Sequence, residues 1–271
     1  MVLPLHLTAV GAYLAAWVVQ LRGFRVRRAG RQGVELYVMA AAAAVHLTAL
    51  IVFSFDTRTI PLVGLGPASS SLALIIVVVF LLTSSGAEAR PAGLFVLPCV
   101  LLLLVEAIAV GLQPVARQTA FREPWFAFHV TSIFIGYAGL LLASAAALMY
   151  LMQFRALKRK QFGSVFRFFP SLDALEGLNR VGLLIGFPAL SLGLLAGWSF
   201  TLTYGRGLAL GDPEVVLGIV SWLAYLTAIA SRRRRRWRGR RAAFVSAGAF
   251  AVTVTAYVVL RLTLTASGFF L

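Results

Sequence analysis

The sequence predicts an all-α membrane protein, a polytopic bundle of about eight transmembrane helices with both termini outside. Three observations lead to this prediction. The 271 residues are 60% hydrophobic and only 13% charged, which is more apolar surface than a water-soluble domain can bury. Apolar runs long enough to cross a bilayer recur along the whole chain. The basic residues are concentrated in alternate connections between these runs.

A helix needs about 20 apolar residues to span a bilayer, and lipid offers no partner for backbone groups outside a helix or a closed barrel. The runs show none of the weak alternation of a membrane β-barrel. No soluble domain or long linker is evident, so residues 1–271 are expected to form a single integral membrane domain. The eight predicted spans are 2–21, 34–55, 68–84, 94–112, 125–153, 181–204, 215–231 and 242–264.

The first span has no basic residue before it, and arginines follow it. This order is the reverse of a cleavable signal peptide, so the span is expected to be a retained helix with its N-terminus outside. The connections after spans 1, 3, 5 and 7 carry most of the arginines and lysines. The positive-inside bias therefore predicts these connections on the cytoplasmic side.

The net charge of +16 reports this topology and does not require a nucleic-acid partner. The run RRRRRWRGRR after the seventh span favours a topology anchor that also contacts anionic lipid headgroups. A docking site for another macromolecule is the alternative reading of the same run.

The sixth span and the segment before it each have a special feature. Residues 162–180 carry leucines on one side and acidic residues on the other, which predicts a short amphipathic helix on the inner surface before the span begins. The glycines between Gly182 and Gly197 favour close helix packing, and Pro188 favours a kink.

All three histidines are predicted in the outer half of the spans. His6 lies near the outer end of the first span, and His129 lies about four residues, or roughly 6 Å, below the outer end of the fifth. His46 lies beyond the midplane of the second span. Two imidazoles on opposite faces of a haem form a familiar iron site, so His46 and His129 are candidate iron ligands. A hydrogen bond within the helix packing is the alternative role of each ring.

Glu106 in the fourth span is predicted at a depth similar to that of His46. A buried carboxyl group needs a partner or a proton. It could accept a hydrogen bond from His46, or be protonated and donate to a backbone carbonyl. The single cysteine, Cys99, excludes an internal disulfide. No phosphate-binding loop, metalloprotease motif or nucleophilic triad is present.

Several stretches resemble a known family when they are taken in order. They are HVTSIFIGYA (His129 to Ala138), the glycine-rich GFPALSLGLLAG, and DPE followed by SWLAY and WRGRR. This order resembles the cytochrome c assembly proteins, the haem-handling membrane proteins of the CcsA/ResC and CcmC superfamily. It looks closest to the short HemX/YpjD-like branch. The resemblance covers roughly residues 34–262.

This resemblance implies haem handling at the outer face of a bacterial cytoplasmic membrane. In the larger relatives, a histidine that matches His129 is an external axial ligand of haem, and a histidine resembling His46 also occurs within a membrane helix. The chain departs from the pattern because no histidine follows His129. The loop YGRGLALGDPEVV also lacks the tryptophans of the relatives, although Trp198 lies slightly upstream.

We therefore expect a carrier or presenter of haem b in cytochrome c biogenesis, without enzymatic activity. Haem would be held non-covalently between His129 and His46, with His6 as a substitute ligand. Arg206 and Arg122 would pair with the haem propionates, and an apocytochrome or an assembly subunit would be the partner. A non-haem regulatory protein of tetrapyrrole metabolism, docking a partner through its inner basic loops, is the first alternative. A small-molecule transporter is the second.

Overall fold

The computed structural model describes residues 1–26, 34–84, 86, 88–113, 124–161, 163–203, 213–233 and 239–266. None of these residues lies in a β-strand, and nearly all of them are helical. The long helices are α1 (Val2–Val26), α2 (Val34–Thr57), α3 (Leu65–Thr83), α4 (Gly93–Val110), α5 (Pro124–Lys158), α7 (Leu172–Thr203), α8 (Pro213–Arg233) and α9 (Arg240–Ala266). Two short helices, η1 (Arg90–Ala92) and α6 (Ser164–Phe168), complete the described chain.

Eight helices of the described chain are long and apolar enough to cross a membrane. The predictions of an all-α fold and of eight spans are therefore confirmed. Many large apolar side chains point outward, among them Phe55 at 79% exposure and Leu82 at 75%. Apolar exposure on this scale is typical of a surface that faces lipid.

The prediction of a separate amphipathic helix in residues 162–180 is wrong for most of that segment. Only α6 precedes the span, and α7 then runs without interruption from Leu172 to Thr203. Leu175 is fully buried and Leu178 is nearly so, because both side chains join the main hydrophobic core. The leucine stripe therefore continues the buried face of α7 and does not form a surface-lying helix.

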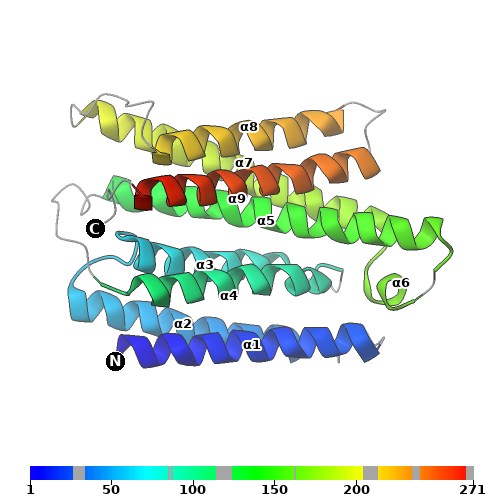
Figure 1. Ribbon diagram of the computed structural model, residues 1–271, viewed down its shortest axis with the longest axis horizontal. Coiled ribbons are helices and arrows are strands. Elements are labelled where there is room, and N and C mark those ends of the chain that lie inside the picture. Colours follow the sequence, from blue (N-terminus) through cyan, green and yellow to red (C-terminus); the bar gives the residue numbers. More distant parts are fainter. Residues whose placement is uncertain are drawn as a thin grey trace.

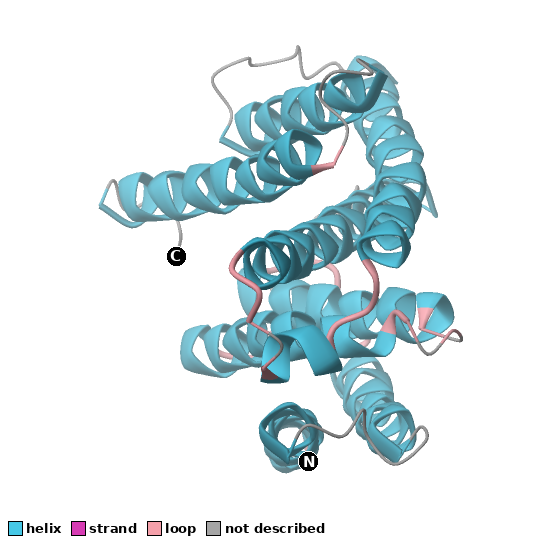
Figure 2. Cartoon of the chain, turned by 90° about the vertical axis from the view of Figure 1, so that its right-hand side faces the viewer, coloured by secondary structure: helices cyan, strands magenta, loops and turns pink. Residues whose placement is uncertain are grey.

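The helices lie roughly parallel or antiparallel along the long axis of the molecule (Figure 1). Helices α1 to α4 form one group and α5, α7, α8 and α9 form the other, as the end-on view also shows (Figure 2). Helix α5 joins the groups, since it packs against α3 and α4 on one side and against α7 and α9 on the other.

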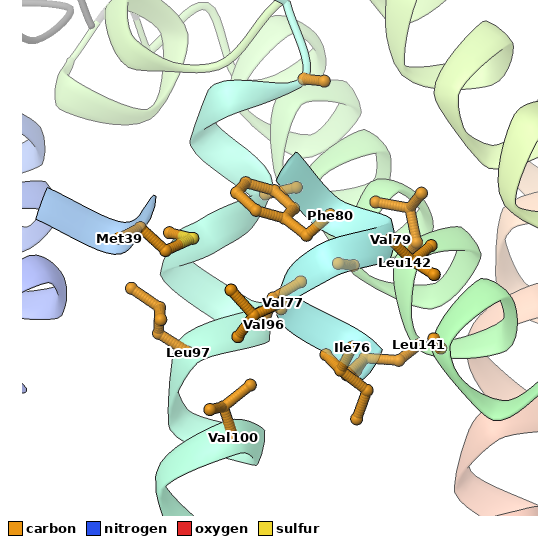
Figure 3. Close-up of a cluster of buried hydrophobic side chains, with 14 of the residues drawn as sticks. Met39, Ile76, Val77, Val79, Phe80, Val96, Leu97, Val100, Leu141 and Leu142 are labelled. Carbon is orange, nitrogen blue, oxygen red and sulfur yellow. The ribbon is translucent and has the colours of Figure 1, made fainter. Parts of the chain in front are cut away.

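The larger of the two hydrophobic cores lies where α2, α3, α4 and α5 meet (Figure 3). Phe80 of α3 is 1% exposed, and Met39 of α2 and Leu97 of α4 are fully buried. Side chains that Figure 3 labels in this core include Met39, Ile76, Val77, Val96, Leu97, Val100, Leu141 and Leu142.

Helices α5 and α7 approach each other more closely than ordinary side chains would allow. A Cβ atom built on Gly139 of α5 would lie 2.6 Å from the Cα atom of Gly186 in α7. One built on Gly182 would lie 2.7 Å from the backbone nitrogen of Ala143. These contacts confirm that the glycines of α7 serve close helix packing, and α7 continues through Pro188.

Basic residues gather at one end of the bundle. Helices α1, α5 and α8 end, and α7 and α9 begin, at the right-hand end of Figure 1. Arg25, Lys158 and Arg240 belong to these helix ends. Helix α1 begins and helix α9 ends at the opposite end, as an even number of spans requires.

Candidate functional site

His46 lies in a buried polar cluster that α1, α2 and α3 form together. Its Nε2 atom lies 2.8 Å from the Oγ atom of Ser70, and the Nε2 atom of His6 lies 3.0 Å from the same oxygen. The hydroxyl of Tyr13 is 3.4 Å from Nδ1 of His46. The four side chains are fully buried, and the two imidazole rings meet edge to face with their centroids 5.7 Å apart.

The donor and the acceptor of each hydrogen bond in this cluster can be assigned when both rings are neutral. Nδ1 of His6 lies 2.9 Å from the carbonyl oxygen of Val2, which can only accept, so Nδ1 of His6 carries the proton. Nε2 of His6 then accepts from the Ser70 hydroxyl, and the Ser70 oxygen accepts from Nε2–H of His46. Nδ1 of His46 accepts from the hydroxyl of Tyr13. Every polar atom of the two rings therefore has a partner within the bundle.

Glu106 binds hydroxyl groups from two other helices. Ser69 of α3 donates to its Oε2 atom over 3.3 Å, and Tyr257 of α9 donates to its Oε1 atom over 2.6 Å. Ser69 and Ser70 are consecutive residues, so α3 contacts Glu106 through one hydroxyl and the histidines through the next. Both ring nitrogens of His46 are occupied by Tyr13 and Ser70, so the structure gives Glu106 and His46 different partners.

His129 lies at the beginning of α5, where its ring packs against α7. Its Nδ1 atom is 2.6 Å from the carbonyl oxygen of Gly193. A carbonyl oxygen only accepts, so Nδ1 carries the proton and Nε2 of the neutral ring has the free lone pair. The ring lies directly over Gly197, because a Cβ atom there would be only 2.7 Å from Nδ1.

Exposed aromatic side chains lie next to His129 along α5 and next to Gly197 along α7. Trp125 and Phe128 precede it on α5, with 63% and 46% of their surface exposed and their ring centroids 6.1 Å apart. Trp198 follows Gly197 on α7 and is 51% exposed. This end of the α5–α7 pair therefore combines an imidazole with apolar aromatic surface.

The structure does not join His46 and His129 through any described contact. His46 bonds to α1 and α3, His129 bonds to α7, and α3 packs against both α2 and α5. The expected substitute ligand, His6, is the histidine that lies beside His46. Within the described residues, no group of three or more histidine, cysteine, aspartate or glutamate side chains could hold a metal ion. Arg206 and Arg122 lie outside the described residues.

The two histidine sites differ in how well they suit haem iron. At His129, a backbone carbonyl holds the protonated nitrogen, and the other nitrogen has no hydrogen bond to any residue that the structure describes, which is the usual arrangement of a ligating histidine. At His46 and His6, an iron atom would have to displace Ser70 from both Nε2 atoms. The residues present therefore fit a haem iron at His129 better than at the buried pair.

A second polar network lies toward the basic end of the bundle. The side-chain oxygen of Asn179 in α7 accepts from Arg232 of α8 and, over 3.3 Å, from Ser246 of α9. Arg232 also lies 3.8 Å from Glu176, at the start of α7. The first arginine of the basic run is thus part of the helix packing, and its side chain is only 18% exposed.

Sequence reasoning did not identify Tyr13, Ser70 or Asn179. The signal for Ser70 was the run Ser69 to Ser71 in an otherwise apolar span, at the depth of the histidines. Asn179 could have been found as an uncharged polar residue on the leucine face of α7. Tyr13 lies near the middle of the predicted span 2–21 and not at an interface, where tyrosine is common, and this position was its signal.

Comparison with known proteins decides which family this bundle represents. Residues 34–266 match the family described as "Cytochrome C assembly protein". The chain belongs to the cytochrome c assembly family. The predicted resemblance over residues 34–262 is therefore confirmed, and of the eight long helices only α1 lies wholly outside the match.

Curated members of the cytochrome c assembly family are similar over much of the chain. The cytochrome c biogenesis protein CcsA of Heterosigma akashiwo is 23% identical, over 81% of this chain and 81% of its own length. The protein of the same name from Guillardia theta is 26% identical, over 64% of this chain and 62% of its own length. The protein of the same name from Chlamydomonas reinhardtii is 28% identical, over 61% of this chain and 47% of its own length.

Proposed function

We propose that this protein is a haem-handling component of cytochrome c biogenesis that presents haem at the outer end of the bundle, with His129 as the iron ligand. Membership of the cytochrome c assembly family supports the role in cytochrome c biogenesis. Eight apolar helices support a multi-pass membrane protein. Haem is the cargo in this proposal, and the chain supplies binding and orientation without covalent chemistry of its own.

The observation that carries the proposal is the hydrogen bond between Nδ1 of His129 and the carbonyl oxygen of Gly193. This bond fixes the neutral tautomer in which Nε2 can bind iron, and it makes Nε2 a better electron donor. Trp125, Phe128 and Trp198 offer exposed aromatic surface on which an apolar macrocycle can lie.

His46 was expected from the sequence to be a second iron ligand, but both nitrogens of its ring have other partners, Tyr13 and Ser70. We therefore assign the iron to His129 and treat His46, with His6 beside it, as ligands that variants must test. Glu106 is linked to this pair only through α3, where Ser69 bonds to Glu106 and Ser70 bonds to the two imidazoles.

The proposal also includes an orientation. The basic end would face the cytoplasm of a bacterium, where arginines and lysines contact anionic lipid headgroups. Both chain termini and His129 would then lie at the extracytoplasmic face. Arg206 and Arg122 would pair with haem propionates there, and an apocytochrome or an assembly subunit would receive the cargo.

The test uses the full chain purified in detergent and titrated with haem. The wild type is expected to develop a Soret band that survives washing, and His129→Ala is expected to lose it. His46→Ala and His6→Ala test the other two histidines of the chain, and loss of the band in either variant assigns that ring as a further iron ligand. Gly177→Ala is the control, because a Cβ atom there would meet nothing within 4 Å. A wild type that remains colourless after haem addition overturns the proposal and favours the non-haem regulatory role.

A further inference from the structure

We propose that Gly197 is a positioning residue for the haem ligand, and that the face of α7 formed by Gly193 and Gly197 sets the tautomer and the ring orientation of His129. This inference rests on the proposed function. It goes further because it assigns the control of the ligand to α7 and not to the helix that carries the histidine.

Helix α7 determines which nitrogen of His129 can bind iron. The carbonyl oxygen of Gly193 is 2.6 Å from Nδ1 of His129 and can only accept a hydrogen bond. Nδ1 is therefore the protonated nitrogen of the neutral ring, and Nε2 is the atom that can coordinate. Without this acceptor the ring would be free to adopt either tautomer.

The imidazole ring of His129 occupies the space that a side chain at Gly197 would need. A Cβ atom on Gly197 would lie 2.7 Å from Nδ1 and 3.3 Å from Nε2 of His129. Both distances are shorter than an ordinary van der Waals contact, so any larger residue moves the ring away from α7. Such a movement would also lengthen the hydrogen bond to Gly193.

Gly193 and Gly197 form one surface of α7. They are four residues apart on α7, so they lie on the same face of the helix, one turn from each other. A Cβ atom on Gly193 would lie 2.7 Å from the side chain of Ile133 and 3.2 Å from the backbone oxygen of His129. This face is held against α5 by the close contact of Gly139 with Gly186, and the hydrogen bond from Tyr225 to the Gly136 oxygen, at 2.6 Å, holds α8 against the same part of α5.

The main experiment measures haem affinity of the full chain by Soret titration in wild type and Gly197→Ala. We expect about 10-fold to 100-fold weaker binding in the variant, as when the hydrogen-bond partner of a ligating histidine is removed. Gly177→Ala is the matched control on the same helix, because a Cβ atom at Gly177 would meet nothing within 4 Å. Wild-type affinity in Gly197→Ala overturns the inference.

A double variant separates positioning from general damage. If Gly197 acts through the ring of His129, Gly197→Ala destabilises the haem-free chain less in a His129→Ala background than in the wild type, because the added Cβ atom then has no ring to displace. An equal loss of stability in both backgrounds shows that Gly197 acts independently of the ring, and this contradicts the inference. A wild type that binds no haem at all defeats the proposed function instead, so the two failures are distinguishable.

A measurement without any variant of Gly197 tests the tautomer directly. Nitrogen-15 NMR of histidine-labelled, haem-free protein distinguishes protonated from unprotonated ring nitrogens. With three histidines in the chain, a His129→Gln sample assigns the signals. A protonated Nδ1 and an unprotonated Nε2 at His129 are expected. The opposite tautomer contradicts the inference even if Gly197→Ala fails to fold.

Discussion

Asn179 of α7 donates its side-chain N–H to the carbonyl oxygen of Ala143 in α5, over a distance of 2.5 Å. The oxygen of the same amide accepts from Arg232 of α8 and Ser246 of α9. A single buried amide therefore connects four helices near the basic end of the bundle. Inside a membrane protein such a group has no water to replace a lost partner.

Replacing Asn179 by alanine is expected to destabilise the bundle by about 1–3 kcal/mol, because it removes the acceptor of the Arg232 guanidinium and of the Ser246 hydroxyl. Unfolding of the detergent-solubilised chain in a denaturant series measures the change. Thr48→Ala is a suitable control, since its hydroxyl bonds only to the preceding turn of its own exposed helix face. Equal stability of the two variants would contradict the role of Asn179.

Ser70→Ala is expected to leave Nε2 of His6 and Nε2 of His46 without a partner at the same time. The loss should again be about 1–3 kcal/mol, and it should shrink when His46 is replaced as well. A double-mutant cycle of Ser70→Ala with His46→Ala measures this coupling. Strictly additive effects would show that the chain of hydrogen bonds does not act as a unit.

Gly139→Ala is expected to push α5 away from α7, since the added Cβ atom would meet the backbone of Gly186 at 2.6 Å. Overpacking of this kind typically costs about 1–3 kcal/mol. Thermal unfolding of the purified chain measures it, with Gly11→Ala as the control because that position is open. An unchanged melting temperature in Gly139→Ala would show that the helices can separate without cost.

The orientation can be tested with cysteines accessible to a membrane-impermeant maleimide. In a Cys99→Ala background, Asp56→Cys marks the end of α2 and Lys158→Cys marks the end of α5. Intact cells are expected to label only at position 56, and position 158 is expected to react after the cells are permeabilised. The reverse pattern would place the basic end outside.

The sequence was sufficient to predict the eight spans because apolar length and charge asymmetry are local signals. It failed at the start of α7, where the stripe of Leu175 and Leu178 fits a surface helix and a buried helix equally well. Periodicity identifies the apolar face but does not tell whether lipid or another helix covers it.

The site was predictable only in part. His129 and its match to the family came from the sequence, but its partners are backbone atoms of α7, which have no sequence signature. The pairing of His46 with His6, and not with His129, depends on which helices are neighbours. Depth in the membrane is readable from the sequence, whereas position around the bundle is not.

Helix α1 lies outside the match to the cytochrome c assembly family, which begins at Val34, yet it supplies His6 and Tyr13 to the environment of His46. His46 thus lies in the region shared with the family, but two of the side chains that bury it belong to a helix outside that region. In any relative that lacks an equivalent of this helix, the same ring would open toward lipid or toward another subunit. A truncated chain that contains only the shared region would therefore hold His46 in a different environment.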